Sequence, residues 1–187
     1  MKNCKNRIAI LVSIIYFIGM GACKKQESNN TQISEENELI TSVSLTLIDS
    51  LTNDTINVKW SQIGGPGTAI VVDTLNLKVN STYTVFTQIL DESKSPIFNV
   101  SDEIKADANH HRFVYSSSAT GISTSILDFD SHIPPMELGL NFKLRTSNLS
   151  TGKFNVMLKH YTEDSPKTLG LQAGSTDIDL SFPVEIK

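Results

Sequence analysis

Four histidines carry most of the titratable chemistry that this chain could use. They stand at positions 110, 111, 132 and 160. Imidazole nitrogens bind Zn²⁺ and Cu²⁺, particularly where a carboxylate oxygen completes the ligand set. His110 and His111 are adjacent, and neighbours in a strand point to opposite faces, so at most one of them can join such a site. His160 shares the parity of the apolar residues from Phe154 to Leu158, which places it at the end of an apolar strand face. The alternative is a histidine that hydrogen-bonds a backbone carbonyl at a sheet edge.

Motifs of catalysis are missing from the sequence. It contains no G-x-S-x-G elbow, no H-E-x-x-H, no C-x-x-C and no P-loop, and Gly64–Gly67 lacks the lysine that a phosphate loop needs. Two carboxylate pairs, Asp128 with Asp130 and Asp177 with Asp179, could serve acid–base chemistry or bind Ca²⁺. Because apolar residues alternate with them, we expect these aspartates to line the solvent face of strands. The sequence therefore predicts a protein that is not an enzyme.

The elements that would position these residues are strands, because apolar residues recur at every second position from Glu38 onward. Such alternation is typical of antiparallel sheets with one face on a core and one in water. The apolar sets span residues 39–47, 56–60, 75–79, 83–89, 138–144, 154–158 and 178–186. Turn-forming residues separate the sets, and Thr151-Gly152 has the composition of a hairpin bend.

A single short helix is expected over residues 101–109, where Ser101 is a plausible N-cap and Asp102 and Glu103 follow it. About seven to nine short strands with one short helix predict an all-β fold. The first choice is an antiparallel immunoglobulin-like β-sandwich, and the alternative is an open β-barrel.

The N-terminus has the layout of a secretory signal. Lys2, Lys5 and Arg7 precede an uncharged apolar run over residues 8–20, which ends at Gly21-Ala22-Cys23. Small residues directly before a cysteine resemble the lipobox of bacterial lipoproteins, a resemblance that implies cleavage before Cys23 and lipid attachment to its thiol. The apolar run is shorter than the roughly 20 residues that span a bilayer.

Three segments follow from this layout. Residues 1–22 are expected to be the signal peptide, residues 23–37 the lipidated cysteine with a disordered tether, and residues 38–187 the β-sandwich domain. The tether expectation rests on composition, since residues 24–37 hold one apolar side chain, Ile33.

The charge balance limits the partners. Without residues 1–22 the chain has 13 basic and 20 acidic residues, a formal charge of -7. Nucleic acid requires basic surface to neutralise phosphates, so no nucleic-acid partner is expected. Only Cys23 would be left as a cysteine, and the lipid would occupy its thiol, so a disulfide within the chain and a thiolate metal site are both excluded.

The domain resembles a family of small envelope lipoproteins of Bacteroidota-type bacteria that has no assigned activity. The stretches that carry the resemblance are NELITSVSLTL at 37–47, LNLKVNSTYTVFTQILDES at 75–93, VSDEIKADANHHRFVY at 100–115, LDFD at 127–130, ELGLNFKLRT at 137–146, GKFNVMLKH at 152–160 and GSTDIDLSFPVEI at 174–186. Proteins like these often carry the label "type 1 periplasmic binding fold superfamily protein". That label implies a two-lobed α/β receptor of roughly twice this length, which the strand pattern contradicts.

The resemblance also bears on function. His111, His160 and Asp177 match positions that recur in the family, and they are the candidate ligands of a Zn²⁺ or Cu²⁺ ion. The function expected first is that of a lipid-anchored, non-enzymatic binding or accessory protein of the bacterial envelope, in the outer membrane, with another envelope protein as its partner. The alternative is a metal-binding lipoprotein that uses the three candidate ligands.

Overall fold

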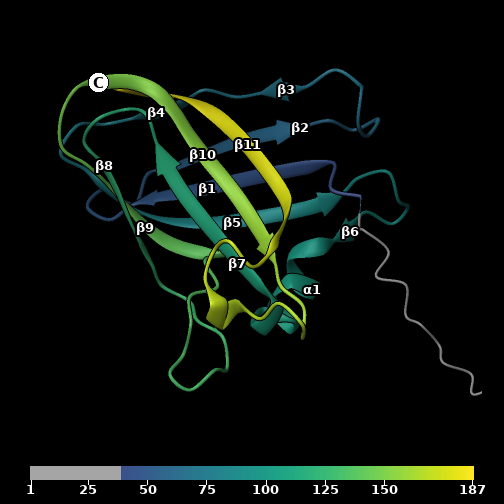
Figure 1. The fold of residues 1–187 in the computed structure, drawn as a ribbon. Helices are drawn as coiled ribbons and strands as arrows, with labels where there is room; N and C mark the ends of the chain where they lie inside the picture. The colour runs from purple at the N-terminus through teal and green to yellow at the C-terminus, as the bar shows by residue number, and fades with distance from the viewer. Residues whose placement is uncertain (1–38) are drawn as a thin grey trace, which may run out of the picture. The chain divides into compact units, whose positions relative to one another are not determined.

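Two β-sheets packed face to face make up the fold of residues 39–187, the part of the chain that this computed structural model describes (Figure 1). The all-β sandwich predicted from the alternation is confirmed, and the open edges of both sheets exclude a closed barrel. Eight strands have five residues or more and three are shorter, so the predicted number of strands is close. No helix within the described range is long and apolar enough to cross a membrane.

The larger sheet, sheet A, has the strand order β3-β2-β1-β5-β9-β8, and β6 pairs with the end of β5. All its pairings are antiparallel. Its strands are β1 (Ser42–Asp49), β2 (Thr55–Ser61), β3 (Val71–Val72), β5 (Thr82–Asp91), β6 (Phe98–Asn99), β8 (Ile122–Ile126) and β9 (Asn141–Thr146).

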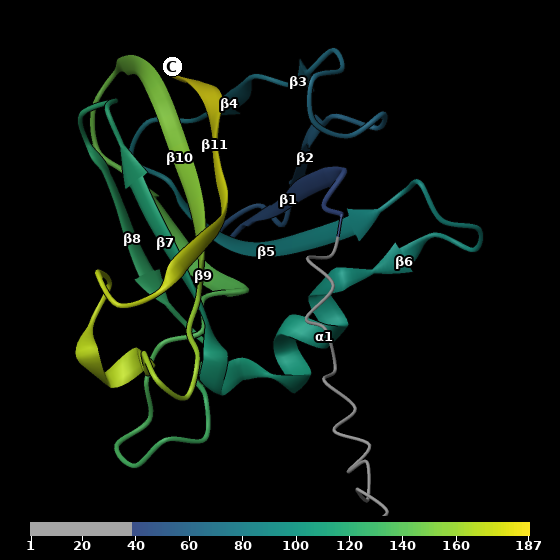
Figure 2. The same cartoon turned by 45° about the vertical axis from the view of Figure 1, so that its right-hand side comes forward.

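The smaller sheet, sheet B, has the order β4-β11-β10-β7 and crosses over sheet A (Figure 2). Its strands are β4 (Leu75–Leu77), β7 (His111–Ser117), β10 (Ser150–His160) and β11 (Ser175–Ile186). The expectation of a purely antiparallel fold is wrong at one place, since β4 and β11 run parallel, with Val184 opposite Leu75. The long connection from β4 to the end of the chain allows this pairing, which a hairpin cannot make.

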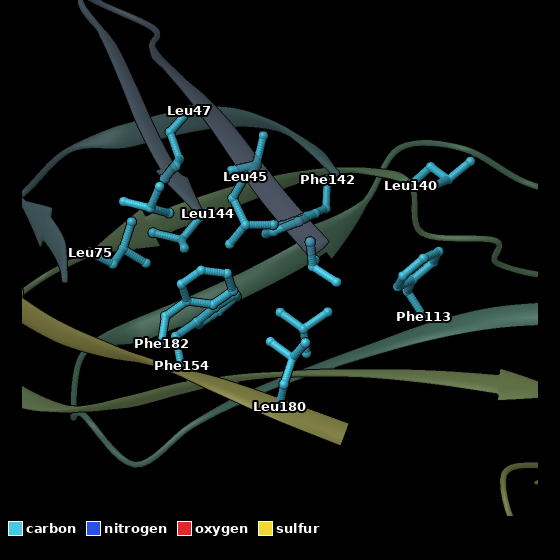
Figure 3. Close-up of a cluster of buried hydrophobic side chains, with 14 of the residues drawn as sticks. Leu45, Leu47, Leu75, Phe113, Leu140, Phe142, Leu144, Phe154, Leu180 and Phe182 are labelled. Carbon is cyan, nitrogen blue, oxygen red and sulfur yellow. The ribbon is translucent and has the colours of Figure 1, made fainter. Parts of the chain in front are cut away.

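The core lies between the sheets, where the alternating apolar residues of both meet (Figure 3). Leu45 and Phe142 of sheet A and Phe154 and Phe182 of sheet B are each at most 1 % exposed. Aromatic rings cross the interface, because Phe142 stacks on Tyr115 of β7 with ring centroids 3.9 Å apart. Burial of this apolar surface is the main stabilising contribution available to a domain without disulfides.

One short helix, α1 (Val100–Ala106), follows β6, and a 3₁₀ turn, η1 (Ala108–His110), leads from it into β7. Val100 and Ile104 anchor α1 to the core. The predicted N-cap is wrong: Asn99 occupies that position, and the Ser101 hydroxyl instead accepts a hydrogen bond of 2.7 Å from the backbone N–H of Ile89. A second 3₁₀ turn, η2 (Lys167–Leu169), lies between β10 and β11.

The predicted hairpin bend at Thr151-Gly152 is also wrong. Both residues lie inside β10, and the connection from β9 occupies residues 147–149. Gly152 is required there by a close approach rather than by a turn, because a Cβ at this position would stand 2.5 Å from the backbone nitrogen of Ala119. The predictions for Cys23, for the signal peptide at 1–22 and for the tether at 23–37 fall outside the described residues.

Candidate functional site

His111 and His160 face each other at one end of sheet B. They are a register pair of the antiparallel strands β7 and β10, two positions beyond the pair Phe113 and Leu158 and so on the same face. Phe113 and Leu158 are buried, so the two imidazoles continue the core-facing side of the sheet to its edge. Their rings stack with centroids 4.8 Å apart and planes inclined by 8°.

Asp107 brings a carboxylate to this pair. It lies between α1 and η1, where the chain leaves the helix with φ -107° and ψ 42°. One ligand-capable atom from each of Asp107, His111 and His160 lies within 4.8 Å of the other two. We call these three residues the histidine cluster; it unites a helix end with the edge of sheet B.

The tautomer of His111 follows from its hydrogen bond. His111 Nδ1 lies 3.0 Å from the backbone oxygen of Asp107, and because a carbonyl oxygen only accepts, Nδ1 must carry the proton. Nε2 therefore keeps the lone pair that a metal binds. Such a carbonyl partner commonly orients a metal-binding histidine.

Burial favours the neutral form of His111. It lowers the pKa of His111 below its ordinary value, and the charge of His160 acts in the same direction, while the contacts to Asp107 act against them. A neutral imidazole is the form that coordinates a cation. The side chain is 14 % exposed, so the site is shielded but still reachable from solvent.

The geometry suits a transition metal after the cluster contracts. Zinc binds histidine nitrogen at about 2.0–2.1 Å, so the ligand atoms of a tetrahedral ion stand roughly 3.4 Å apart. The most distant atoms of the cluster, 4.8 Å apart, therefore need to approach by roughly 1.4 Å, which requires the side chains to rotate. Two nitrogens and one oxygen match the ligand preference of Zn²⁺ and Cu²⁺ and leave a coordination position for water or a further ligand.

Asp177, the predicted carboxylate ligand, lies next to the cluster. The register of β10 and β11 shifts between Leu158 and Lys159, and Asp177 is the additional residue of β11 at this bulge. Its charge is one of the smaller influences on the pKa of His111, which burial lowers overall. The assignment of Asp177 as a ligand stays a prediction. Asp107, the carboxylate within the cluster, was missed, because its place depends on how α1 ends and on the pairing of strands 50 residues apart.

His110 does not enter the cluster, so the expectation that at most one of the two adjacent histidines joins it holds. The reason differs from the expected one, because His110 ends the 3₁₀ turn η1 and is not part of β7. Its Nδ1 lies 2.7 Å from Asp107 Oδ1, and its Nε2 lies 3.4 Å from a Glu163 oxygen. The hydrogen bond with Asp107 raises the pKa of His110. The same hydrogen bond holds the Asp107 carboxylate in place beside His111.

A buried ion pair lies beneath this end of the sandwich. Lys167 Nζ of η2 donates to Asp130 Oδ2 at 2.7 Å and to the backbone oxygen of Ala108 at 3.2 Å, and neither charged side chain is exposed. The predicted solvent face for Asp130 is therefore wrong. Asp128 is also engaged inward, accepting from the backbone N–H groups of Gly139 and Asn141.

A polar hollow of about 410 Å³ opens beside the cluster. Asp107 forms part of its wall, so the hollow borders the histidine cluster. The other side chains and backbone that line it belong to Lys105, Ala106, Ala108, Asn109, His110, Phe129, Asp130 and Ser131.

Comparisons with known proteins give no further assignment. No family model matches the chain, and no curated protein or solved structure is significantly similar to it.

Proposed function

We propose that this protein is a lipid-anchored, non-enzymatic binding protein of the bacterial envelope, held in the outer membrane, and that its ligand is a Zn²⁺ or Cu²⁺ ion. Asp107, His111 and His160 bind the ion, and Asp177 adds a nearby negative charge. The protein sequesters the ion or passes it to another envelope protein.

The observation that carries the metal-binding proposal is the stacked pair His111 and His160 with Asp107 beside it. Burial of two imidazoles on the inner face of a sheet costs free energy that burial of Leu or Phe would not cost. Coordination of a metal ion by both imidazoles would offset this cost. Its ligands come from three separate elements, so binding would also hold the end of α1 against sheet B.

The anchor is supported by the sequence alone. A basic start, a short apolar run and Gly21-Ala22-Cys23 give the order of parts found in lipoprotein signals. Two or more acyl chains on one cysteine are sufficient for stable membrane attachment. Replacement of Cys23 by alanine is expected to release the protein from the membrane fraction.

The metal proposal is tested by purifying the full chain without chelator and titrating it with Zn²⁺, Cu²⁺ and Ca²⁺ by isothermal calorimetry, with native mass spectrometry to count ions. We expect one Zn²⁺ or Cu²⁺ per chain and no Ca²⁺, because imidazoles favour the transition metals. The His111→Ala/His160→Ala double variant should lose binding by at least about 100-fold, as expected when two of three ligands are removed.

The matched control is His132→Ala, which removes an imidazole outside the cluster. His132 Nδ1 bonds Asp130 at 2.9 Å, so circular dichroism should verify that this variant is folded. Equal affinity in the wild type and in the cluster double variant, or no binding in either, contradicts the proposal.

A protein partner is the second candidate, favoured by exposed apolar side chains on the loops at the same end. Ile133 is 98 % exposed, and Phe129 and Leu169 are also exposed. If no ion binds, cross-linking from position 133 in intact cells tests this candidate. A specific adduct that disappears in Ile133→Ser would support it.

A further inference from the structure

The loop between β2 and β3, residues 62–70, is the second feature of the domain with an unusual surface. Residues 60–72 contain no charged side chain. Ile63 is 54 % exposed, Ile70 is 56 % exposed and Val71 at the start of β3 is 65 % exposed. Three large aliphatic side chains on an uncharged segment form an apolar surface that no described part of the domain covers.

This apolar loop lies where the described chain begins. The backbone N–H of Gln62 donates to the oxygen of Thr41 at 2.8 Å, which ties the loop to the residues just before β1. A Cβ added at Gly65 would stand 3.6 Å from Leu39 Cδ1, so the first described side chain lies against the loop. Figure 1 shows the loop between β2 and β3 on the side from which β1 starts.

Several polar groups of the loop bond to one another. Gly65 N–H donates to the Gln62 oxygen at 2.9 Å, and the Gln62 side-chain amide donates to the Thr68 oxygen at 3.0 Å. The Thr68 hydroxyl donates to the Gly65 oxygen at 2.8 Å. Moving this loop out of water costs less than moving a charged loop, because no charged side chain loses its hydration.

We propose that this loop contacts the membrane, inserting Ile63, Ile70 and Val71 into the lipid interface beside the anchored Cys23. The inference rests on the lipid anchor of the proposed function. The 14 residues from Lys24 to Asn37 span at most roughly 46 Å when fully extended. Leu39 and the loop against it are therefore the part of the domain closest to the anchor along the chain, and they meet the bilayer at high effective concentration.

Phospholipid is the occupant that fits this surface best. The formal charge of -7 after residues 1–22 opposes adsorption to anionic lipid through charge, so the domain must use apolar contact. Side chains of this kind bury readily at the boundary between headgroups and acyl chains. Contact at this end would orient the domain, with the opposite end of sheet A directed away from the membrane.

The test uses the full, lipidated chain in phosphatidylcholine–phosphatidylethanolamine vesicles. An environment-sensitive NBD fluorophore is attached at Ile70→Cys, and the matched control carries it at Leu149→Cys. Leu149 is 69 % exposed and follows β9. It lies at the end of sheet A opposite the loop. Arg145 near the end of β9 pairs with Thr82 at the start of β5, whereas the loop follows Ser61, which pairs with Ser42 at the start of β1. We expect a roughly two-fold or larger rise in emission at position 70, because the probe leaves water, and no change at position 149.

The vesicle experiment separates membrane contact of the loop from lipid anchoring and from dimer formation. Quenching of the position 70 probe by nitroxide lipids supports the proposal, and an Ile63→Ser/Val71→Ser background should reduce that quenching. If the protein floats with the vesicles but emission is equal and insensitive to lipid at both positions, the membrane contact is overturned and the anchor is not. Failure to float contradicts the anchor itself. A probe at position 70 that is shielded in detergent as a dimer identifies a second copy of the chain as the occupant and also overturns the proposal.

Discussion

Tyr115 of sheet B and Thr87 of sheet A are joined by a hydrogen bond of 2.8 Å across the core. The Tyr115 hydroxyl donates in turn to the backbone oxygen of Gly139 at 2.6 Å, so the Thr87 hydroxyl is the donor to Tyr115. Burial raises the pKa of Tyr115, which keeps the hydroxyl protonated and able to donate. One phenol therefore links both sheets and the segment that leads into β9.

Replacement of Tyr115 by phenylalanine should lower the free energy of unfolding by about 1–3 kcal/mol, because the Gly139 oxygen and the Thr87 hydroxyl lose a buried partner. Urea denaturation followed by circular dichroism measures the change. Tyr161→Phe is the matched control, since its buried hydroxyl has no hydrogen-bond partner within residues 39–187. We expect little change or a slight gain there, and equal losses in both variants would contradict the role of the Tyr115 bonds.

The buried pair of Lys167 and Asp130 predicts non-additive substitutions. Lys167→Met and Asp130→Asn each leave one charged or polar partner buried without its counterpart, and each should destabilise the domain by about 3–5 kcal/mol. The double variant should be considerably less destabilised than the sum of the two, because no unpaired charge is left. A double-mutant cycle from thermal or urea unfolding measures this coupling, and simple additivity would show that the pair contributes no interaction.

Acid should weaken the domain through Asp130. Burial opposes ionisation of this carboxyl, but hydrogen bonds from Lys167 and from the backbone N–H groups of Met136 and His132 outweigh it and lower its pKa to about 2. Unfolded Asp130 has the ordinary value near 3.8 and binds protons first, so its contribution is complete above about pH 4 and is lost as the pH falls through 2. From the difference between the two pKa values, that contribution is about 2 kcal/mol.

The comparison that isolates this effect is the difference in unfolding free energy between wild type and Asp130→Asn. It should shrink as the pH falls from 5 toward 2.5, while acid effects shared by other carboxylates such as Asp91 cancel. A difference that stays constant over this range would mean that Asp130 titrates alike in the folded and unfolded chain.

Metal binding should stabilise the folded domain by mass action. At a free Zn²⁺ concentration about 100 times the dissociation constant, the gain is about 2.7 kcal/mol, which corresponds to a rise in Tm of about 5–10 °C. Differential scanning calorimetry with and without Zn²⁺ measures the shift. The His111→Ala/His160→Ala variant should show no rise, and a rise of the same size in that variant would place binding elsewhere.

Alternation predicted the strands that have one wet and one buried face, such as β1, β5, β9, β10 and β11. It did not reveal β3, β6, β7 or β8, which lie outside the alternating apolar sets. It could not predict that Thr151-Gly152 continues a strand: glycine there reflects the backbone of Ala119 approaching from another segment. The parallel pairing of β4 with β11 was also beyond local sequence, since it joins segments that are more than 100 residues apart.

The site was predictable only in part, for the same reason. The parity of His160 indicated the inner face, but its partner depends on the register of β7 against β10. Asp107 carries no motif and becomes relevant only through the geometry at the end of α1. The sequence pattern predicts a solvent-facing Asp130 because its buried counterion, Lys167, lies 37 residues further along the chain and is not visible in the local pattern.

The pairing of β4 with β11 affects how the protein is made. β11 occupies an inner position of sheet B, between β4 and β10, and the backbone of Lys187 exchanges hydrogen bonds with Leu77 and Val79. Because β11 is synthesised after β4, β7 and β10, sheet B cannot reach this strand order until β11 has left the ribosome. A truncation before Ser175 would leave only the pairing of β7 with β10 and would separate β4 from the sheet.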